Sequence, residues 1–205
     1  MPNYSRLERE FYTRPTLQVA RELLGKRLVR VDDGVRVAGL ITETEAYIGE
    51  TDQGCHARFG LTRRTRVMYG APGHAYVYFT YGKHWMLNFV TEREGFPAAV
   101  LIRGLFPLEG VEWIASRRAG LPLNRWTDGP AKICLALRID GAFHGSDLCA
   151  PDAALFVEDG EPIAEECVTI SPRVGLNNVP EPWKSIPWRF RVLEDRLPQR
   201  SRRTG

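Results

Sequence analysis

Alternating apolar and polar positions predict that much of the chain forms β-strands. The first two runs flank residues 32–34, where Asp33 and Gly34 favour a tight hairpin turn. Two further runs flank residues 81–84, which predicts a second hairpin. The longer β-rich runs lie at 26–31, 35–47, 75–80, 85–90 and 98–105, and shorter ones follow at 155–157, 168–170 and 188–192. The centre of the protein is therefore predicted to be a meander of strands.

Helical periodicity is limited to three short segments, at residues 16–24, 108–118 and 130–137. In the first segment Leu17, Ala20 and Leu24 share one face, and Gly25 follows as a stop signal. Asp128 precedes the third segment and is predicted to cap its N-terminus. Helices and strands are segregated along the chain and do not alternate as βαβ units. This order favours an α+β fold over a doubly wound parallel sheet.

Length and composition fit one domain spanning residues 1–205. The chain has 205 residues and is 43% hydrophobic, which is enough for a single substantial core. Residues 48–66 are polar and glycine-rich without a sustained period, so they are predicted to form a surface loop of a length that is often functional. The basic tail 199–205 is predicted to be disordered.

Composition narrows the setting in which the protein works. The sequence contains no run of eighteen apolar residues and no leader-like N-terminal region, so we expect neither export nor membrane insertion. The four cysteines form no CxxC pair and no zinc-site spacing with histidine. We therefore expect reduced thiols, no metal, and a cytoplasmic location that is nucleoid-associated if the source is bacterial. The net charge of +3 permits a polyanionic partner without requiring one.

Two carboxylates and a phenol fall at the end of the second predicted strand. Residues two apart in a strand point to the same side, so Glu43, Glu45 and Tyr47 are predicted to converge. One interpretation is a solvated strand face, because carboxylates are mostly exposed. The other interpretation is a site for acid-base chemistry.

Three tyrosines lie within six positions around the second predicted hairpin. Tyr76 and Tyr78 share one face of a strand, and Tyr81 follows in the turn. Such residues can be core aromatics whose hydroxyls find partners. They can also form a platform for a flat aromatic ligand, since each nucleobase stack contributes roughly 1–3 kcal/mol.

Basic side chains cluster beside these tyrosines. Arg63, Arg64 and Arg66 lie in the predicted loop, and Lys83 lies in the hairpin turn. Charges of this kind are usually solvent-facing. Together with a tyrosine in a turn, however, they have the composition of a surface that contacts phosphates and wedges between bases. Lys132 follows a glycine and a proline at a helix start, where contact with a phosphate and plain exposure are equally open interpretations.

Four ordered motifs carry a family resemblance. They are ITETEAYIGETDQGCHA, VMYGAPGHAYVYFTYGKHWMLN, VLIRGLFPLEG and DGPAKICLAL. In their order and separation they resemble the alkyladenine, or 3-methyladenine, DNA glycosylases of the non-helix-hairpin-helix type, from Leu23 to Phe190. The chain departs from the family in LNNVPEPWKSIPWRF after Gly175, and two residues are inserted within 91–97, which we place in a hairpin loop.

The resemblance implies a single compact domain with a curved, mostly antiparallel β-sheet, flanking helices, and a protruding hairpin that enters the minor groove. Tyr81 is similar to the family residue that intercalates where a nucleotide has been flipped out. Tyr47, His56 and Tyr78 match the pocket that sandwiches the extruded base. Asn88 matches a gatekeeper whose side chain would clash with the 2-amino group of guanine.

The resemblance also implies the chemistry. Glu45 matches the general base, and with Arg103 and the main-chain carbonyl of Val174 it would hold the attacking water. A carboxylate there would stabilise an oxocarbenium-like transition state and deprotonate that water. Purines methylated at N3 or N7 are cationic, which makes them good leaving groups and attracts them to aromatic rings.

The implied protein is a monofunctional DNA glycosylase that flips alkylated or deaminated purines out of duplex DNA, hydrolyses the N-glycosidic bond and starts base excision repair. It would be a monomer that binds double-stranded DNA and needs no cofactor. No lysine or N-terminal proline stands where lyase chemistry would need one. The residues alone leave two other functions open: a non-catalytic nucleic-acid-binding module, and a hydrolase of free nucleosides or other glycosides that uses Glu43 and Glu45.

Overall fold

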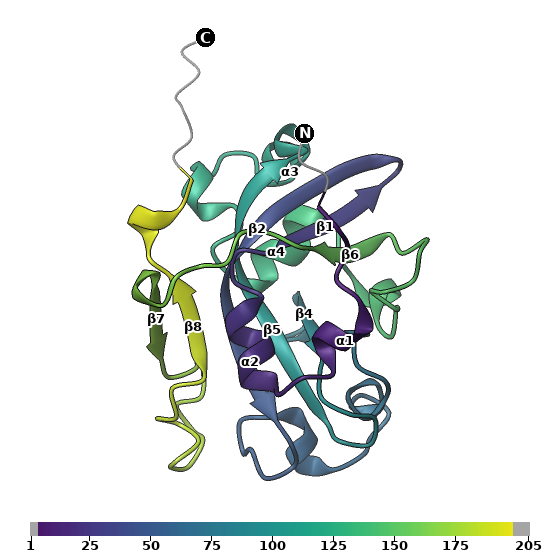
Figure 1. The fold of residues 1–205 in the computed structure, drawn as a ribbon, viewed down its shortest axis with the longest axis vertical. Helices are drawn as coiled ribbons and strands as arrows, with labels where there is room; N and C mark the ends of the chain where they lie inside the picture. Colours follow the sequence, from purple (N-terminus) through teal and green to yellow (C-terminus); the bar gives the residue numbers. More distant parts are fainter. Residues whose placement is uncertain (1–3, 199–205) are drawn as a thin grey trace.

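The computed structural model describes residues 4–198, in which eight strands form one antiparallel sheet (Figure 1). The order along the sheet is β3-β4-β5-β2-β1-β6, with β8 also paired to β2 and β7 paired to β8. The strands are β1 Arg27–Asp32, β2 Val35–Ile48, β3 Ala75–Thr80, β4 His84–Val90, β5 Ala98–Glu109, β6 Leu155–Glu158, β7 Val168–Ser171 and β8 Arg189–Val192. The predicted strand runs are therefore confirmed.

Short helices pack on this sheet. The α-helices are α1 Arg9–Tyr12, α2 Thr16–Glu22, α3 Val111–Arg117 and α4 Pro130–Leu137. Single turns of 3-10 helix occur at His56–Phe59, Arg66–Tyr69, Leu123–Arg125, Gly141–Phe143, Glu165–Cys167 and Glu194–Arg196. Helix α2 packs on β2 and β5, and α4 packs on β4 and β5 (Figure 1). The α+β prediction is confirmed.

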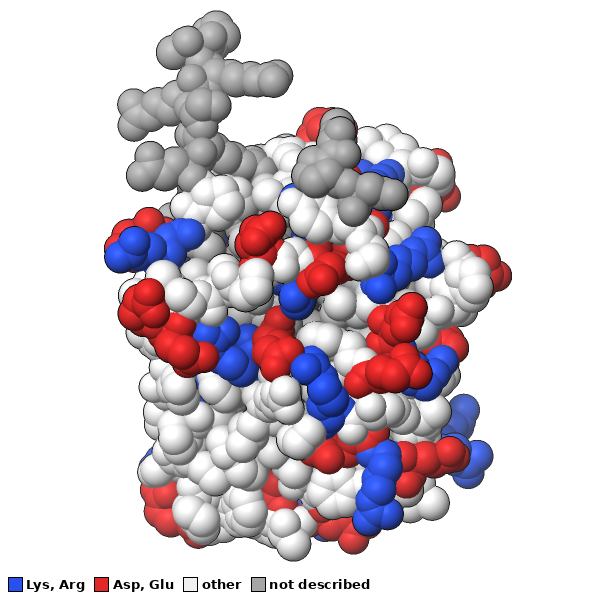
Figure 2. All heavy atoms as spheres, in the orientation of Figure 1, with Lys and Arg blue, Asp and Glu red and all other residues white. Residues whose placement is uncertain are grey.

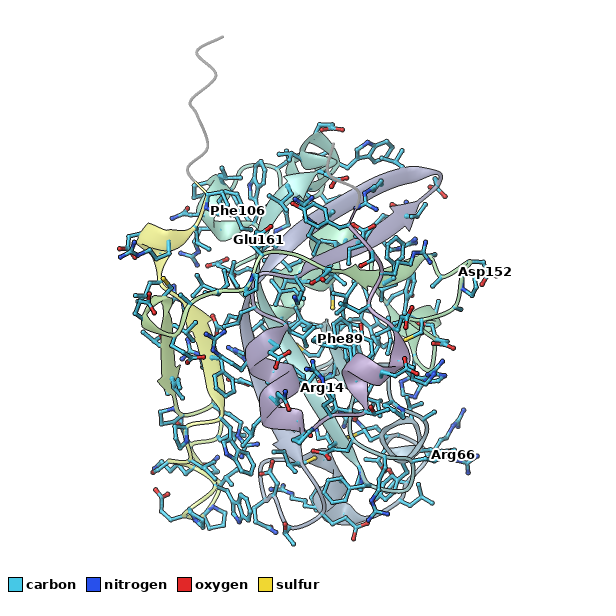
Figure 3. All side chains as sticks on the ribbon, viewed as in Figure 1. Arg14, Arg66, Phe89, Phe106, Asp152 and Glu161 are labelled. Atoms are coloured by element: carbon cyan, nitrogen blue, oxygen red, sulfur yellow. The ribbon has the colours of Figure 1, made fainter. Side chains whose placement is uncertain are left out.

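Strand alternation gives the sheet two different faces, and the helices cover one of them. On that face the Thr44 hydroxyl donates to the Ala20 carbonyl of α2 at 2.7 Å. Phe89 of β4 lies in the middle of this core (Figure 3). The main core also contains Val19 and Leu23 from α2, Ile133 and Leu137 from α4, and Val100 and Ile102 from β5. This face holds most of the apolar surface that stabilises the fold.

A second, smaller cluster is separate from the main core. Its buried members are Cys55, Ala57, Met68, Tyr76, Val90 and Ala99, and Tyr47 and Tyr78 pack at its margin. Ala46 and Val100 belong to the main core under the helices. Tyr47 and Ala99 are the next residues along the same strands, so their side chains point to the opposite face of the sheet. The sheet thus places its helical core on one side and an aromatic cluster on the other.

Both hairpin turns use left-handed backbone conformations. Asp33 and Gly34 have φ values of 50° and 78°, and Tyr81 and Gly82 have 53° and 64°. Positive φ at both central residues suits the twist of a hairpin. A tyrosine in this conformation is uncommon, and its side chain is 85% exposed. The turn between β3 and β4 therefore presents an aromatic ring to solvent.

Two helix predictions were wrong in detail. The predicted helix 108–118 is shorter in the structure, because β5 continues along β2 as far as Glu109 and α3 begins at Val111. Leu17 was predicted on the buried face of α2 but is 36% exposed, and Val19 is buried instead. The helix lies against the sheet along a stripe rotated toward Val19, Ala20 and Leu23.

The predicted cap of α4 was also wrong. The residue before the helix is Gly129, and no side chain caps it. Asp128 instead accepts a hydrogen bond from Lys132 at 2.7 Å and pairs with Arg125 at 3.1 Å. Its carboxylate is therefore engaged with cations on the surface and not with the backbone of the first turn.

The helices, the cysteines and the C-terminal tail were each the subject of a prediction. Among the described residues, no helix has the length and apolar character that crossing a bilayer requires. All four cysteines are free. The predicted disordered tail at 199–205 lies outside the described residues.

Gly25 offers a test of the packing between the turn after α2 and the loop that follows β6. Its φ is +86°, and an added Cβ would lie 2.4 Å from the carbonyl oxygen of Glu161. Gly34 has a similar φ of +78° but open space around it. We expect Gly34→Ala to lower the free energy of unfolding by roughly 1–2 kcal/mol through backbone strain. Gly25→Ala should cost about 1–3 kcal/mol more, because the clash adds to the strain. Urea unfolding measures both, and equal losses would contradict this packing.

Candidate active site

One row of cross-strand neighbours runs along the face opposite the helices. Tyr76 of β3 pairs with Asn88 of β4, and Asn88 pairs with Leu101 of β5. Leu101 pairs with Glu45 of β2, and Glu45 pairs with Arg189 of β8. Directly opposed residues share a face, so these five side chains project on the same side. The register of the sheet therefore brings Glu45 into line with the aromatic cluster.

Arg103 shares the face of Leu101 by strand alternation, and the pairing of β2 with β5 becomes irregular at this residue. Thr44 pairs with Ile102 and Glu43 pairs with Gly104, which leaves Arg103 without an opposite residue. Such a bulge redirects a side chain. A Cβ on Gly104 would lie 2.7 Å from the Thr42 hydroxyl, so glycine permits this close approach.

Glu43 and Glu45 both bind the guanidinium of Arg103. Its Nε donates to Glu43 Oε1 at 2.9 Å and lies 3.3 Å from Glu45 Oε1. Its Nη1 donates to Glu45 Oε2 at 3.4 Å. The predicted convergence of Glu43, Glu45 and Tyr47 is confirmed, and the solvated-face interpretation is excluded for Glu45, which is 0% exposed.

Glu45 has two further donors. The Val174 N–H donates to Oε1 at 2.7 Å, and the Tyr47 hydroxyl donates to Oε2 at 2.8 Å. Burial is the largest influence and raises the pKa of Glu45 above its ordinary value, against the opposing effects of Arg103, the Val174 N–H and Tyr47. Burial and the adjacent carboxylate raise the pKa of Tyr47, so its phenol stays protonated and can donate. The result is an oriented, unusually basic carboxylate.

A cavity of about 310 Å³ opens beside this carboxylate. Tyr47, Arg103 and Val174, which all bond Glu45, line it. Its other walls include His56, Tyr76, Tyr78, Tyr81, Met86 and Asn88. The volume falls at the lower end of the range for small-molecule sites, and the lining is mainly aromatic and apolar with a few polar groups.

Aromatic rings form one side of this cavity. The ring centroids of Tyr76 and Tyr78 lie 5.4 Å apart, and His56 meets Tyr78 edge-on at 4.6 Å. His56 Nδ1 is 2.9 Å from the Tyr76 hydroxyl. Burial, with the charges of Arg64 and Arg58, lowers the pKa of His56 to about 4. The imidazole is therefore neutral near pH 7.

Asn88 lies in the cavity wall between the aromatic rings and Glu45. Its side-chain nitrogen donates to the Tyr76 carbonyl at 3.0 Å, and the residue is buried. A backbone partner on the neighbouring strand fixes the orientation of the amide. Asn88 thus presents a rigid polar group inside an apolar space.

The loop that carries Val174 is held by a buried ion pair. Arg173 Nη1 and Nη2 donate to the two oxygens of Asp52 at 2.5 and 2.8 Å, and both side chains are fully buried. Nη1 also donates to the Ala46 carbonyl at 3.0 Å. The guanidinium lies 4.7 Å from the centre of the Tyr47 ring. Two loops and β2 therefore meet behind Glu45.

The predicted basic residues lie in different settings. The Arg64 guanidinium is 4.8 Å from the centre of the Tyr78 ring, at the cavity. Arg63, Arg66 and Lys83 are exposed, and the Arg66 side chain points outward in Figure 3. Lys132 bonds Asp128. The structure therefore brings Arg64 to the site and leaves the other three loop and turn cations free to meet a partner.

Charge on the side that carries α1 and α2 is mixed. Figure 2 shows Lys and Arg interspersed with Asp and Glu over that face. A face of both signs does not favour a polyanion. Within residues 4–198, moreover, no three His, Cys, Asp or Glu side chains gather as a metal site would require.

A second, larger cavity of about 890 Å³ adjoins the first. Arg103 and Val174 line both cavities, and Glu43 and Arg189 line the larger one. Arg103 thus contacts both cavities as well as the carboxylate pair.

Sequence reasoning missed three residues of this site. Asp52 and Arg173 form the buried ion pair, and Arg189 bonds Glu43 at 2.8 Å. None of the three stands in a pattern that reveals its partner, because the residues of each pair are more than 100 positions apart. The Arg173 position directly before Val174 was the one available signal.

The fold and site define an α+β protein in which a buried acid lies beside an aromatic cavity. A family model described as methylpurine-DNA glycosylase matches residues 10–196. A protein from Methanocella arvoryzae is 50% identical over 185 residues, which covers 90% of each chain. One from Chlorobaculum parvum is 45% identical over 185 residues, covering 90% of this chain and 86% of its own. Both relatives bear the name "Putative 3-methyladenine DNA glycosylase".

The chain therefore belongs to the methylpurine-DNA glycosylase family. A third relative, from Carboxydothermus hydrogenoformans, has the same name and is 45% identical over 184 residues, covering 90% of this chain and 93% of its own. The family resemblance predicted from the four motifs is confirmed.

The buried ion pair predicts a large effect on stability. Asp52→Asn leaves the Arg173 charge buried without a counter-charge, so the free energy of unfolding should fall by about 3–5 kcal/mol. Asp195→Asn makes the same change in an exposed pair with Arg196 and should stay within about 0.5 kcal/mol of the unaltered protein. Urea unfolding at pH 7 compares them. Similar small losses in both variants would show that the buried pair does not hold the two loops.

Proposed function

We propose that this protein is a DNA glycosylase that hydrolyses the N-glycosidic bond of alkylated or deaminated purines in duplex DNA. Membership of the methylpurine-DNA glycosylase family supports this proposal, as do the names of its relatives. The observation that carries it is the buried Glu45 carboxylate, oriented by three donors at the edge of an aromatic cavity.

Glu45 acts as the general base. Cleavage of the bond develops positive charge on the sugar, which a nearby carboxylate stabilises while it deprotonates the attacking water. The pKa raised by burial makes Glu45 a stronger base than an ordinary carboxylate. Arg103 and the main-chain carbonyl of Val174 help to hold the water. The Val174 N–H already bonds Glu45, so the same residue orients both the base and its water.

The aromatic cavity receives the damaged base. Tyr47, His56 and Tyr78 contact its faces, and a cationic alkylated purine gains roughly 0.5–2 kcal/mol from each ring face that it meets. A neutral His56 supports this role, because a charged imidazole would repel such a base. Asn88, held by the backbone of β3, excludes the 2-amino group of normal guanine.

DNA binds on the side of the β3–β4 turn. Tyr81 fills the gap left by the flipped nucleotide from the minor groove, and Arg63, Arg64, Arg66, Lys83 and Lys132 contact the phosphate backbone. A damaged base is less costly to unstack, so flipping itself contributes to selection. The exposure of Tyr81, in an unusual backbone conformation beside the cavity, supports this assignment. One copy of the chain carries all of these groups, so a monomer is sufficient for the proposed reaction.

Water, not an amine, is the nucleophile. No lysine is among the residues that line the cavity of about 310 Å³ in the described part of the chain. Without an amine at the sugar no Schiff base forms, so the enzyme is monofunctional and leaves the DNA strand intact. Its product is an abasic site, the starting point of base excision repair.

Glu45→Gln tests the proposed base. The amide keeps the size of the side chain but cannot accept a proton, so we expect binding to lesion-containing duplex to persist and base release to fall by at least about 100-fold. The assay incubates protein with methylated duplex DNA, without added metal, and measures free 3-methyladenine.

Glu22→Gln is the matched control, because this carboxylate at the end of α2 pairs with Arg14 and lines neither cavity. It should release base at the unaltered rate. The proposal is wrong if the unaltered protein binds DNA but releases no base, or if Glu45→Gln releases it normally.

Tyr81→Ser tests the proposed intercalation. Loss of one stacking ring should weaken binding to lesion duplex by roughly 1–3 kcal/mol, about 5- to 150-fold in Kd. Fluorescence anisotropy measures the affinity. Ile170→Ser removes another exposed apolar side chain, on β7, and should leave Kd unchanged. Equal affinities for both variants would rule out a stacking role for Tyr81.

A further inference from the structure

Glu43 binds two arginines next to the proposed base, Glu45. Its Oε1 accepts from Arg103 Nε at 2.9 Å and from Arg189 Nε at 2.8 Å. Arg191 Nε lies farther away, 3.9 Å from Oε2. The side chains of Glu43, Arg103 and Arg189 are all less than a quarter exposed. Glu43 is therefore held by cations from the strands on both sides of β2.

The register of the sheet explains this arrangement. Arg189 stands directly opposite Glu45 in the β2–β8 ladder, and Arg103 comes from the bulge on β5. Arg103 has one Nε–H, which points to Glu43 and not to Glu45, although both carboxylates lie within 3.3 Å. The shortest of its contacts thus goes to Glu43, which lines the larger cavity, and not to the proposed base.

We propose that Glu43 is a positioning residue that anchors Arg103 against the bulge and divides its charge between two carboxylates, so that Glu45 is oriented but not fully neutralised. This inference rests on the proposed role of Glu45 as general base. It assigns a role to Glu43, which bonds Arg103 and Arg189, whereas Glu45 bonds Tyr47 and Val174 of the cavity wall.

The charged groups around Glu45 set the direction of the effect. Glu43 and Tyr47 approach from its own strand, Arg103 from β5, Arg189 from β8 and Tyr78 from β3. The negative charge of Glu43 raises the pKa of Glu45, whereas Arg103 lowers it. Arg189 offsets Glu43 through their direct bond. If Arg103 paired with Glu45 alone, it would stabilise the charged carboxylate more strongly. Glu45 would then have a lower pKa and be a weaker base.

Two substitutions should move the reaction in opposite directions. Glu43→Gln keeps an oxygen acceptor but removes the negative charge, so the pKa of Glu45 falls. The acid limb of single-turnover base release should then shift to lower pH by roughly half a unit or more, and the plateau rate should fall several-fold. Arg189→Gln removes a positive charge opposite Glu45 and leaves the negative charge of Glu43 less compensated. The pKa of Glu45 should then rise, and the acid limb should shift to higher pH.

The controls carry the same chemical changes elsewhere. Glu22→Gln matches the first variant, and Arg196→Gln, in an exposed pair with Asp195, matches the second. Neither should move the acid limb. A merely structural role for Glu43 would lower the rate at every pH without shifting the profile. Limbs that stay in place, or that move in the same direction for both variants, would overturn the proposal.

A second measurement does not depend on activity. Titration of the Glu45 side-chain carboxyl carbon by NMR should show the same opposite shifts in the two variants. If the unaltered protein releases no base, the proposed function fails, but these titrations still decide whether Glu43 and Arg189 act on Glu45. If either variant is unfolded, the other is sufficient, because each predicts a shift of known sign.

Discussion

A carboxylate that is removed from water must be compensated by charge and hydrogen bonds, and the site is organised around this requirement at Glu45. Tyr47, Arg103 and the Val174 N–H supply the compensation from three different parts of the chain. Two of these donors depend on a further feature of the fold. Arg103 projects from the bulge on β5, and the buried pair of Arg173 with Asp52 fixes the loop of Val174.

One face of the sheet carries the hydrophobic core that stabilises the fold, and the other carries the candidate site. Helices α2 and α4 bury the main core on one face, where Phe89 lies. The other face carries one row of neighbours from Tyr76 to Arg189, which includes Asn88 and Glu45. Because adjacent residues of a strand point to opposite faces, Thr44 and Ala46 stabilise the fold while Glu45 between them remains available for function. A rigid sheet thus holds a polar site that costs stability.

Local patterns predicted what depends on local geometry. Period-two alternation gave the strands, both hairpins and the convergence of Glu43, Glu45 and Tyr47. It could not give the bulge at Arg103 or the pairing of Asp52 with Arg173, because both depend on register between distant segments. Leu17 is exposed because tertiary contacts outweigh local preference. Asp128 does not cap α4 because Gly129 is the residue before the helix and because nearby cations take its carboxylate. Arg103 and Val174 were reached through the family motifs and not through any pattern in the residues around them.

The most direct test of the account is a crystal structure of the Glu45→Gln protein bound to duplex DNA that contains a single alkylated or deaminated purine. The account predicts that the purine leaves the helix and lies between Tyr47, His56 and Tyr78, with Tyr81 in the gap. The anomeric carbon should then lie within reach of residue 45 through one water. A purine that stays stacked in the duplex, or a sugar remote from residue 45, would contradict it.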